Sequence, residues 1–200
     1  IRPPDEINRT QLSRTPDSVP LANAQARAQR LRSIDQWQPL LAHVAAMPGI
    51  VAVAPTVSGA ASARRGEADK AITLYGIERE PFLRVSKLDE KIVAGQLLLN
   101  AGDVIIGTQL AQDLGVGLGD KIRIETARSA GDAFTVRALF DIGNREANRR
   151  NVYVNFRTGQ TLLDLAGGAS SLDIAIGDVF AAEKFAQALR SQTDQKVESW

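Results

Sequence analysis

Apolar residues recur every three or four positions where the regular part of the chain begins. They are Ile34, Trp37, Leu41 and Val44. This spacing places them on one face of a helix, which Asp35 can cap and in whose first turn Pro39 is tolerated. Pro48 and Gly49 stop the pattern. The sequence therefore predicts an amphipathic helix over residues 35–47.

Two strands are predicted after this helix. Ile50–Ser58 and Ala71–Ile77 are rich in apolar and β-branched residues, and the small and charged residues ASARRGEAD between them suit an exposed turn. In the middle third, residues 82–101 are short and mixed in pattern. They are followed by a strand (GDVIIG), a two-turn helix (TQLAQDLG), a turn (VGLGD) and two alternating strands (KIRIETA and FTVRALFDIG) separated by SAGDA. This third predicts a small β-rich subdomain.

The C-terminal part has the most regular pattern. It reads as a strand (NVYVNF), a helix over about residues 157–166, a strand (LDIAIGD), a helix over about residues 180–191 and a final strand (KVESW). We therefore predict an α+β fold. Residues 34–78 and 144–200 would form an α/β sandwich, and residues 79–143 would be a β-rich insertion in it. The two ends of the chain would then lie together near one sheet.

Residues 1–33 form a polar lead-in to this fold. Up to Arg32 they contain four prolines and six arginines against three acidic residues, a composition typical of irregular structure. Residues 21–31 are compatible with a short helix. The excess arginines would suit lipid headgroups or a partner subunit, but a solvated segment is the simpler interpretation.

Composition limits the classes of protein to which the chain can belong. Of its 200 residues 44% are apolar and 24% charged, enough for a real core in one domain or two small joined ones. The 24 basic and 23 acidic residues nearly balance, whereas a dedicated nucleic-acid binder needs clustered excess cation. Without cysteine, disulfides, thiolate zinc sites and cysteine nucleophiles are excluded.

The sequence contains neither a run of about 18 apolar residues nor a basic-then-apolar leader. It starts at Ile1 without an initiator methionine and ends directly after a strand-like segment. We therefore expect it to be a piece of a longer protein, whose other parts could hold a membrane anchor.

The sequence contains no residue pattern typical of a catalytic or metal site. The single histidine, His43, has no acidic neighbour one helical turn away, which excludes an HExxH site and a histidine-based triad with a second imidazole. The glycines at 115, 117 and 119 match no phosphate-loop template and are interpreted as a positive-φ turn. We assign no catalytic, cofactor-binding or metal-binding residue and expect no enzymatic activity.

The strongest basic spots are Arg64 with Arg65, and NREANRR at 144–150. No aromatic residues interleave with them, as a stacking surface for nucleic acid would require. Turn residues or a protein interface fit these spots better, so no nucleic-acid partner is expected.

The order of motifs over residues 34–200 resembles the periplasmic core domain found between the first two transmembrane helices of MacB-type and LolC/LolE-type ABC transporter permeases. The most specific part is VIIGTQLAQDLGVGLGDKIRI at 104–124. The other matching segments are DQW, MPGIVAVAP, LYGIE, the spaced Val85, Leu88 and Gly95, FTVRALFDIG, NVYVNFRTGQTLL and the terminal ESW.

The resemblance implies a porter-like α/β subdomain interrupted by a β-rich, Sabre-like one. It also implies a periplasmic domain of an inner-membrane permease. Such a domain couples cytoplasmic ATP hydrolysis, by mechanotransmission, to extrusion or release of a lipoprotein, lipid or small amphiphile. The implied partners are a second permease subunit, identical or not, an ATPase subunit reached through membrane-spanning parts, and a periplasmic carrier or adaptor.

Three features depart from the family pattern. Lipoprotein-releasing members carry a long hairpin, which grips the lipoprotein carrier, between the strands corresponding to KIRIE and FTVRA, whereas ETARSAGDA is short here. Asn148 stands near the place of a common acidic residue, and the arginine-rich lead-in has no counterpart. Direct capture of a carrier by this chain is therefore not expected.

Two other classes of function stay open. One is a soluble extracytoplasmic binding or adaptor protein, which a start codon just before Ile1 would support. The other is an enzyme with an unrecognised carboxylate site, for which the nominees are Asp141, Glu146 and Asp173, although no spacing pairs a nucleophile with a base. A mechanical role predicts instead that packing and interface positions are sensitive to substitution, namely Trp37, Gly107, Gly119 and Trp200.

Overall fold

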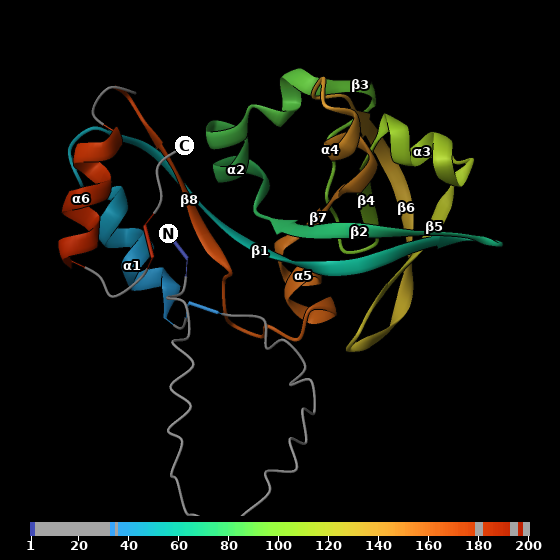
Figure 1. Ribbon diagram of the computed structural model, residues 1–200, viewed down its shortest axis with the longest axis horizontal. Coiled ribbons are helices and arrows are strands. Elements are labelled where there is room, and N and C mark those ends of the chain that lie inside the picture. Colours follow the sequence, from blue (N-terminus) through green and yellow to red (C-terminus); the bar gives the residue numbers. More distant parts are fainter. Residues whose placement is uncertain (3–32, 35, 179–181, 193–195, 198–200) are drawn as a thin grey trace, which may run out of the picture.

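The computed structural model describes residues 1–2, 33–34, 36–178, 182–192 and 196–197 (Figure 1). It has the predicted α+β fold. A larger part is built on strands, and a smaller part contains the helices α1 (Trp37–Ala45) and α6 (Ala182–Gln192). The short helix expected over residues 21–31 and the capping residue Asp35 lie outside the described residues. The helix expected over 35–47 is confirmed as α1 (Trp37–Ala45).

A long hairpin runs through both parts of the molecule. It consists of β1 (Ile50–Arg65) and β2 (Ala68–Ile77), which pair from Thr56 with Ile77 to Arg65 with Ala68. The turn comprises only Gly66 and Glu67, and Gly66 has a φ of 56°. The exposed turn predicted over ASARRGEAD is therefore confirmed at Gly66 and Glu67, but its extent was wrong, because the rest of the segment is strand. Its small residues give a weak strand signal, but the main chain there pairs with both β2 and β5.

Six strands close into a ring. Along the ring the order is β1, β2, β7, β4, β6 and β5, and β5 pairs back with β1. β7 is parallel to β2, β4 is parallel to β6, and the other neighbours are antiparallel. The remaining bounds are β4 (Asp103–Gly107), β5 (Lys121–Thr126), β6 (Ser129–Phe140) and β7 (Asn151–Asn155). We call this closed set of strands the strand ring.

Both faces of β4 and β7 are buried. One face contributes to the larger apolar core, with Val104 and Val152 fully buried. The other face is covered by α2 (Arg79–Ser86), a 3-10 turn at Leu88–Lys91 and β3 (Ile92–Gly95). Burial on both faces explains why VIIG and VYV read as continuous apolar runs and not as alternating ones. The sequence indicated short elements over residues 82–101 but missed helix α2.

The smaller part extends the sheet beyond the ring. β8 (Ser171–Ile176) pairs antiparallel with the first residues of β1, from Ile50 to Thr56. α1 packs against β1, and α6 (Ala182–Gln192) adds Ala186 and Leu189 to the same apolar core. We call β8, α1, α6 and this stretch of β1 the helical part. Of the expected final strand KVESW, the described residues are Lys196, which bridges to Arg2, and Val197.

Three short helices pack against the strand ring. They are α3 (Thr108–Leu114), α4 (Arg145–Arg150) and α5 (Phe156–Leu162). α5 packs unusually close to β2 because two glycines face each other. A Cβ on Gly159 would lie 2.6 Å from the Cα of Gly76. The helix expected to reach residue 166 ends at Leu162. Of the two interpretations of NREANRR, the turn is wrong, because Arg145–Arg150 form α4, and the protein interface stays a prediction.

The division into residues 34–78 with 144–200 and an insertion at 79–143 stays a prediction. Strands from all three segments pair in one connected sheet, with β7 between β2 and β4. The end residues do lie together, as expected. Ile1 and Leu172 exchange main-chain hydrogen bonds of 2.9 Å, and Arg2 bridges to Lys196.

A buried carboxylate joins β4 to β6. Asp103 accepts hydrogen bonds from Arg137 Nε at 2.6 Å and from the main chain and side chain of Asn100 at 3.1 and 2.7 Å. Burial alone would raise the pKa of Asp103, but the hydrogen bonds from Arg137 and Asn100 outweigh it and hold the pKa below its ordinary value.

We expect this carboxylate to make stability depend on pH. A carboxyl group whose pKa is lower in the folded state stabilises the fold above its unfolded pKa of about 3.9, and this contribution is lost as pH falls through the folded pKa. The Asp103→Asn variant should be less stable by about 2 kcal/mol at pH 7, and the difference should shrink below about pH 4. Urea unfolding at several pH values checks this, with Asp132→Asn, an exposed carboxylate of β6, as the control.

Candidate functional site

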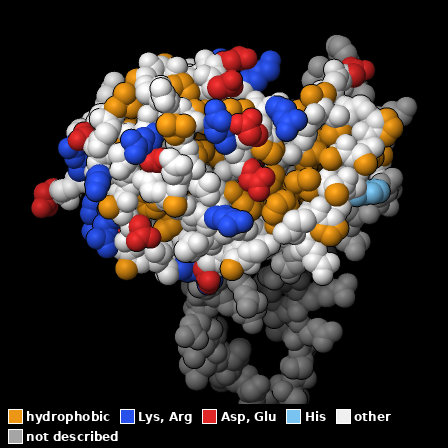
Figure 2. Space-filling view, turned by 180° about the vertical axis from the view of Figure 1, so that it is seen from behind, with side chains coloured by type: hydrophobic (Ala, Val, Ile, Leu, Met, Phe, Trp, Pro, Cys, Tyr) orange, Lys and Arg blue, Asp and Glu red, His pale blue; other side chains and the backbone are white. Residues whose placement is uncertain are grey.

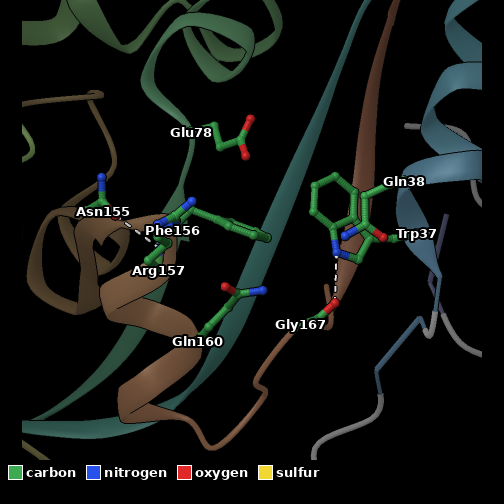
Figure 3. Close-up of a pocket in the computed structure, with 8 residues that line it drawn as sticks. All are labelled: Trp37, Gln38, Glu78, Asn155, Phe156, Arg157, Gln160 and Gly167. Carbon is green, nitrogen blue, oxygen red and sulfur yellow. Dashed lines mark hydrogen bonds between the residues drawn. The ribbon is translucent and has the colours of Figure 1, made fainter.

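Among the described residues, a hollow lies where the helical part meets the strand ring. This cleft has a volume of about 350 Å³ (Figure 3). α1 and the loop before β8 supply one side, and the ends of β2 and β7 with α5 supply the other. The lining residues are Trp37, Gln38, Glu78, Asn155, Phe156, Arg157, Gln160 and Gly167.

Trp37 holds the two sides of the cleft together. Its ring meets the ring of Phe156 edge to face, with the centroids 5.5 Å apart and the planes at 68°. Its indole N–H donates a hydrogen bond of 3.1 Å to the carbonyl of Gly167. Both rings are almost fully buried, so they form a closed apolar base beneath polar side chains.

Amide side chains fix the strand-ring side of the cleft. Asn155 caps α5 by accepting from the main-chain N–H of Arg157 at 3.0 Å, and it donates to the carbonyl of Leu99 at 3.1 Å. Gln160 donates to the carbonyl of Gly168 at 2.8 Å. The Gln160 bond ties α5 to the loop that leads into β8, and the Asn155 bonds tie the start of α5 to the segment at Leu99.

The charged groups of the cleft are Glu78 and Arg157, both exposed. Among the described residues neither side chain makes an ion pair or hydrogen bond that holds it in place. Figure 3 shows both on the strand-ring side, opposite Gln38 of α1. A carboxylate, a guanidinium and the exposed amide of Gln38 can bind polar or zwitterionic groups by hydrogen bonds. Together with the aromatic base, the arrangement suits recognition and does not pair a nucleophile with a base.

The three carboxylates nominated for an enzymatic site do not come together. Asp141 accepts from the N–H of Gly143 at 2.8 Å, which with the Asn148 side chain holds its pKa below the ordinary value. Glu146 pairs with Arg150 one turn later in α4. Asp173 lies on β8 and accepts from the hydroxyl of Thr56 at 2.8 Å. Each therefore has a structural hydrogen bond or ion pair.

Asn148, which was expected to stand near the place of an acidic residue common in the family that the sequence resembles, has a structural role. It is buried in α4, where it accepts from the N–H of Ile142 at 3.1 Å and donates to Asp141 at 2.6 Å. These bonds close the turn after β6. The sequence did not indicate this role, because the partners of Asn148 belong to a turn whose shape only the fold defines.

The other singled-out residues have plain structural positions. Gly115 and Gly119 have φ values of 63° and 82° in the loop between α3 and β5, which confirms the positive-φ turn at these two glycines but not at Gly117, whose φ is not positive. His43 lies exposed on α1. Among the described residues no group of three or more histidine or acidic side chains could hold a metal ion. Trp200 lies outside the described residues.

The basic spots found in the sequence are largely paired with acids. Arg64 lies 2.8 Å from Asp69, and Arg149 lies 2.9 Å from Asp113, whose pKa is lowered by hydrogen bonding from Gln109 and by the arginine. Figure 2 shows the rear face, where basic and acidic side chains are interspersed and apolar ones gather toward the edge that carries His43.

The Trp37 contacts lead to a testable prediction. Trp37→Phe removes the hydrogen bond to Gly167 and should lower the free energy of unfolding by about 1–2 kcal/mol, because the partner carbonyl loses its donor. Gln38→Ala, at the exposed neighbouring position, should change it by less than about 0.5 kcal/mol. Urea unfolding monitored by circular dichroism measures both, and equal effects would contradict the assigned role of the indole.

Comparison with known proteins identifies one family. The family model for the MacB-like periplasmic core domain matches residues 6–192. Among curated proteins, the lipoprotein-releasing system transmembrane protein LolC of Xylella fastidiosa (strain Temecula1 / ATCC 700964) is 27% identical over 143 residues, which cover 66% of this chain and 34% of LolC. The matched region thus spans about a third of the length of that relative.

Two solved structures share the fold. The extracellular domain of the noncanonic ABC-type transporter YknZ from Gram-positive bacteria has a TM-score of 0.61 and 19% identity, covering 82% of this chain and 87% of that one. The periplasmic region of MacB from Actinobacillus actinomycetemcomitans has a TM-score of 0.59 and 18% identity, covering 86% and 80%. In the part of this chain that the structure describes, no helix has the length and apolar character needed to cross a membrane.

Proposed function

The chain belongs to the family of MacB-like periplasmic core domains, and on this basis we propose that it is the periplasmic domain of an inner-membrane ABC transporter permease. In this role it couples ATP hydrolysis in the cytoplasm to extrusion or release of a substrate at the outer side of the inner membrane. The observation that carries the proposal is the family match over residues 6–192.

The geometry of β1 supports a mechanical role. β1 has 16 residues, and a strand of this length spans about 50 Å. Its first residues pair with β8 and its last with β2 and β5, so one continuous strand belongs to both parts of the molecule. A displacement of the helical part is therefore transmitted to the strand ring along a hydrogen-bonded ladder, without a flexible linker.

The partners in this proposal are a second permease subunit, identical or different, and an ATPase subunit reached through membrane-spanning parts. The substrate class is a lipoprotein, a lipid or a small amphiphile. A periplasmic carrier or adaptor is a further candidate partner. Only Ala127 and Arg128 join β5 to β6, so no long hairpin is available there to grip a carrier, and contact with one would have to use another surface.

The size and membrane partition of the endogenous full-length product test this proposal. Cells are fractionated and immunoblotted with an antibody raised against the 200-residue chain. A band well above 21.5 kDa that only detergent releases supports the permease. A soluble band of 21.5 kDa contradicts it and favours the alternative of a soluble extracytoplasmic binding or adaptor protein.

Carboxylate substitutions distinguish a mechanical role from an enzymatic one. In the full-length permease with its ATPase, Asp141→Asn and Glu146→Gln should each keep at least about half of the ATP-dependent transport, since each surface interaction contributes only about 1 kcal/mol or less. A loss of more than tenfold in a variant that still reaches the membrane in normal amount would revive the enzymatic alternative. The ATP-dependent transport of Glu78→Gln tests in the same way whether the carboxylate of the cleft has an enzymatic role.

A further inference from the structure

The cleft between the helical part and the strand ring carries two opposite charges that do not neutralise each other. Glu78 follows the last residue of β2, and Arg157 is the second residue of α5. Both side chains are exposed, and within the described residues neither makes a hydrogen bond or an ion pair. Glu78 also precedes α2, but its side chain does not cap that helix. Both charges are therefore available to a ligand.

The charged neighbours of Glu78 are already engaged. Arg79, the next residue, pairs with Glu80 at 2.5 Å and also donates to a main-chain carbonyl. Elsewhere in the described structure most arginines pair with an acid, as Arg149 does with Asp113 at 2.9 Å. The cleft thus differs from the surrounding surface, because its carboxylate and its guanidinium are both unpaired.

Amide groups in the cleft have unused hydrogen-bonding capacity. A primary amide has two N–H donors and one oxygen acceptor. Gln160 uses one N–H on the carbonyl of Gly168 at 2.8 Å, and Gln38 is exposed and makes no hydrogen bond within the described residues. Figure 3 shows Glu78 at one end of the cleft and Gln160 at the other, with the ring of Phe156 between them. A ligand would thus meet charged and amide groups around an apolar base.

The two charges determine which class of ligand the cleft can hold. A simple anion is attracted by Arg157 but repelled by Glu78, and a simple cation experiences the reverse. A molecule that carries both charges is attracted by both residues. The cleft volume of about 350 Å³ lies near the lower end of the range of about 300–1,000 Å³ that is typical of ligand sites, so the bound group must be small.

We propose that the cleft binds a small zwitterionic group, in which an ammonium is joined through a few bonds to a carboxylate or a phosphate. Glu78 accepts hydrogen bonds from the ammonium, and Arg157 donates two parallel hydrogen bonds to the oxyanion. A short peptide and the phosphoethanolamine headgroup of a lipid share this chemistry. The inference goes beyond the proposed function, because such binding requires neither ATP nor transport.

Nuclear magnetic resonance titration of the ¹⁵N-labelled 200-residue chain tests the proposal, with alanylalanine and O-phosphoethanolamine as probes. At least one probe should shift the indole N–H of Trp37 and the side-chain amides of Gln38 and Gln160 saturably, with a Kd of about 1 mM or tighter. Ethanolamine and acetate, which carry one charge each, should bind at least about tenfold more weakly. Tighter binding of alanylalanine assigns the site to a carboxylate, and tighter binding of O-phosphoethanolamine assigns it to a lipid headgroup.

Variants of the two charged residues complete the test. Glu78→Gln and Arg157→Gln should each weaken binding of the preferred probe at least about tenfold, because each loses charge-assisted hydrogen bonds. Both positions are exposed, so the circular dichroism spectrum should not change. Arg84→Gln, at an exposed position of α2 outside the cleft, is the matched control and should bind as the wild type does.

Three results would overturn the zwitterion site. They are no saturable shift with either probe, binding of ethanolamine or acetate as tight as that of the zwitterions, and wild-type binding by both cleft variants. Each of these results leaves the proposed function intact, since the membrane partition of the endogenous product is measured separately.

Discussion

Replacing Gly107 by alanine should lower the free energy of unfolding by about 3–5 kcal/mol. A Cβ at this position would lie 2.0 Å from the carbonyl oxygen of Asn148 and 2.6 Å from its Cα. These atoms belong to the main chain of α4, so no side-chain rotation relieves the overlap, and α4 must move away from β4. Overpacking of this kind costs about 1–3 kcal/mol, and displacing Asn148 loses two hydrogen bonds of about 1 kcal/mol each.

Gly102 is the matched control for this substitution. A Cβ there meets no atom within 4 Å, and its φ is not positive. Gly102→Ala should leave stability unchanged or raise it by up to about 1 kcal/mol, because alanine restricts the unfolded chain. Urea unfolding of both variants gives the comparison. If Gly107→Ala unfolds within about 0.5 kcal/mol of the wild type, the close packing of α4 on β4 is wrong.

Phe140→Ala should have an effect of similar size, about 3–5 kcal/mol, for the opposite reason. Phe140 is fully buried at the end of β6, where its ring meets the ring of Tyr153 edge to face at 5.3 Å between centroids. Removing the aromatic ring leaves a cavity between the strand ring and the segment that carries α2 and β3. The buried apolar cluster that contains Phe140 joins these two regions. The near-ultraviolet circular dichroism of Tyr153 should weaken as well.

Two further variants provide reference values for this loss of stability. Phe140→Leu fills part of the cavity and should cost less than half as much as alanine. Val93→Ala on β3, where the side chain is 59% exposed, should change stability by less than about 0.5 kcal/mol. An effect of Phe140→Ala no larger than that of Val93→Ala would mean that the cluster does not hold α2 and β3 in place.

Most elements could be read from local sequence because their signals are local. The helix at residues 37–45, the strands VIIG and KIRIE, and the turn with positive φ at Gly115 and Gly119 follow from periodicity and glycine. The predictions were wrong where the local structure depends on contacts between residues that are far apart in the sequence. The segment at 61–65 is strand because β2 and β5 pair with it, and α4 forms where Asn144 caps a helix against β4.

The cleft could not be predicted in the same way. Trp37 was singled out as a packing residue, but Glu78, Asn155, Arg157 and Gln160 carry no pattern that sets them apart from ordinary surface residues. They meet Trp37 only because β7 pairs parallel to β2 and brings the start of α5 next to the loop before β8. The cap formed by Asn155 was the only local signal, since asparagine before a helix is a common N-cap.

By itself the sequence determined the α+β class, the helices α1, α3, α5 and α6, most strands, and the order of motifs that marks the family, because each depends on residues near one another in the chain. The tertiary structure alone decided that β1 runs through both parts, that six strands close into a ring, and that Ile1 lies beside β8. Main-chain hydrogen bonds between strands are nearly independent of side-chain identity. Which strands pair is therefore set by the packing of the whole chain.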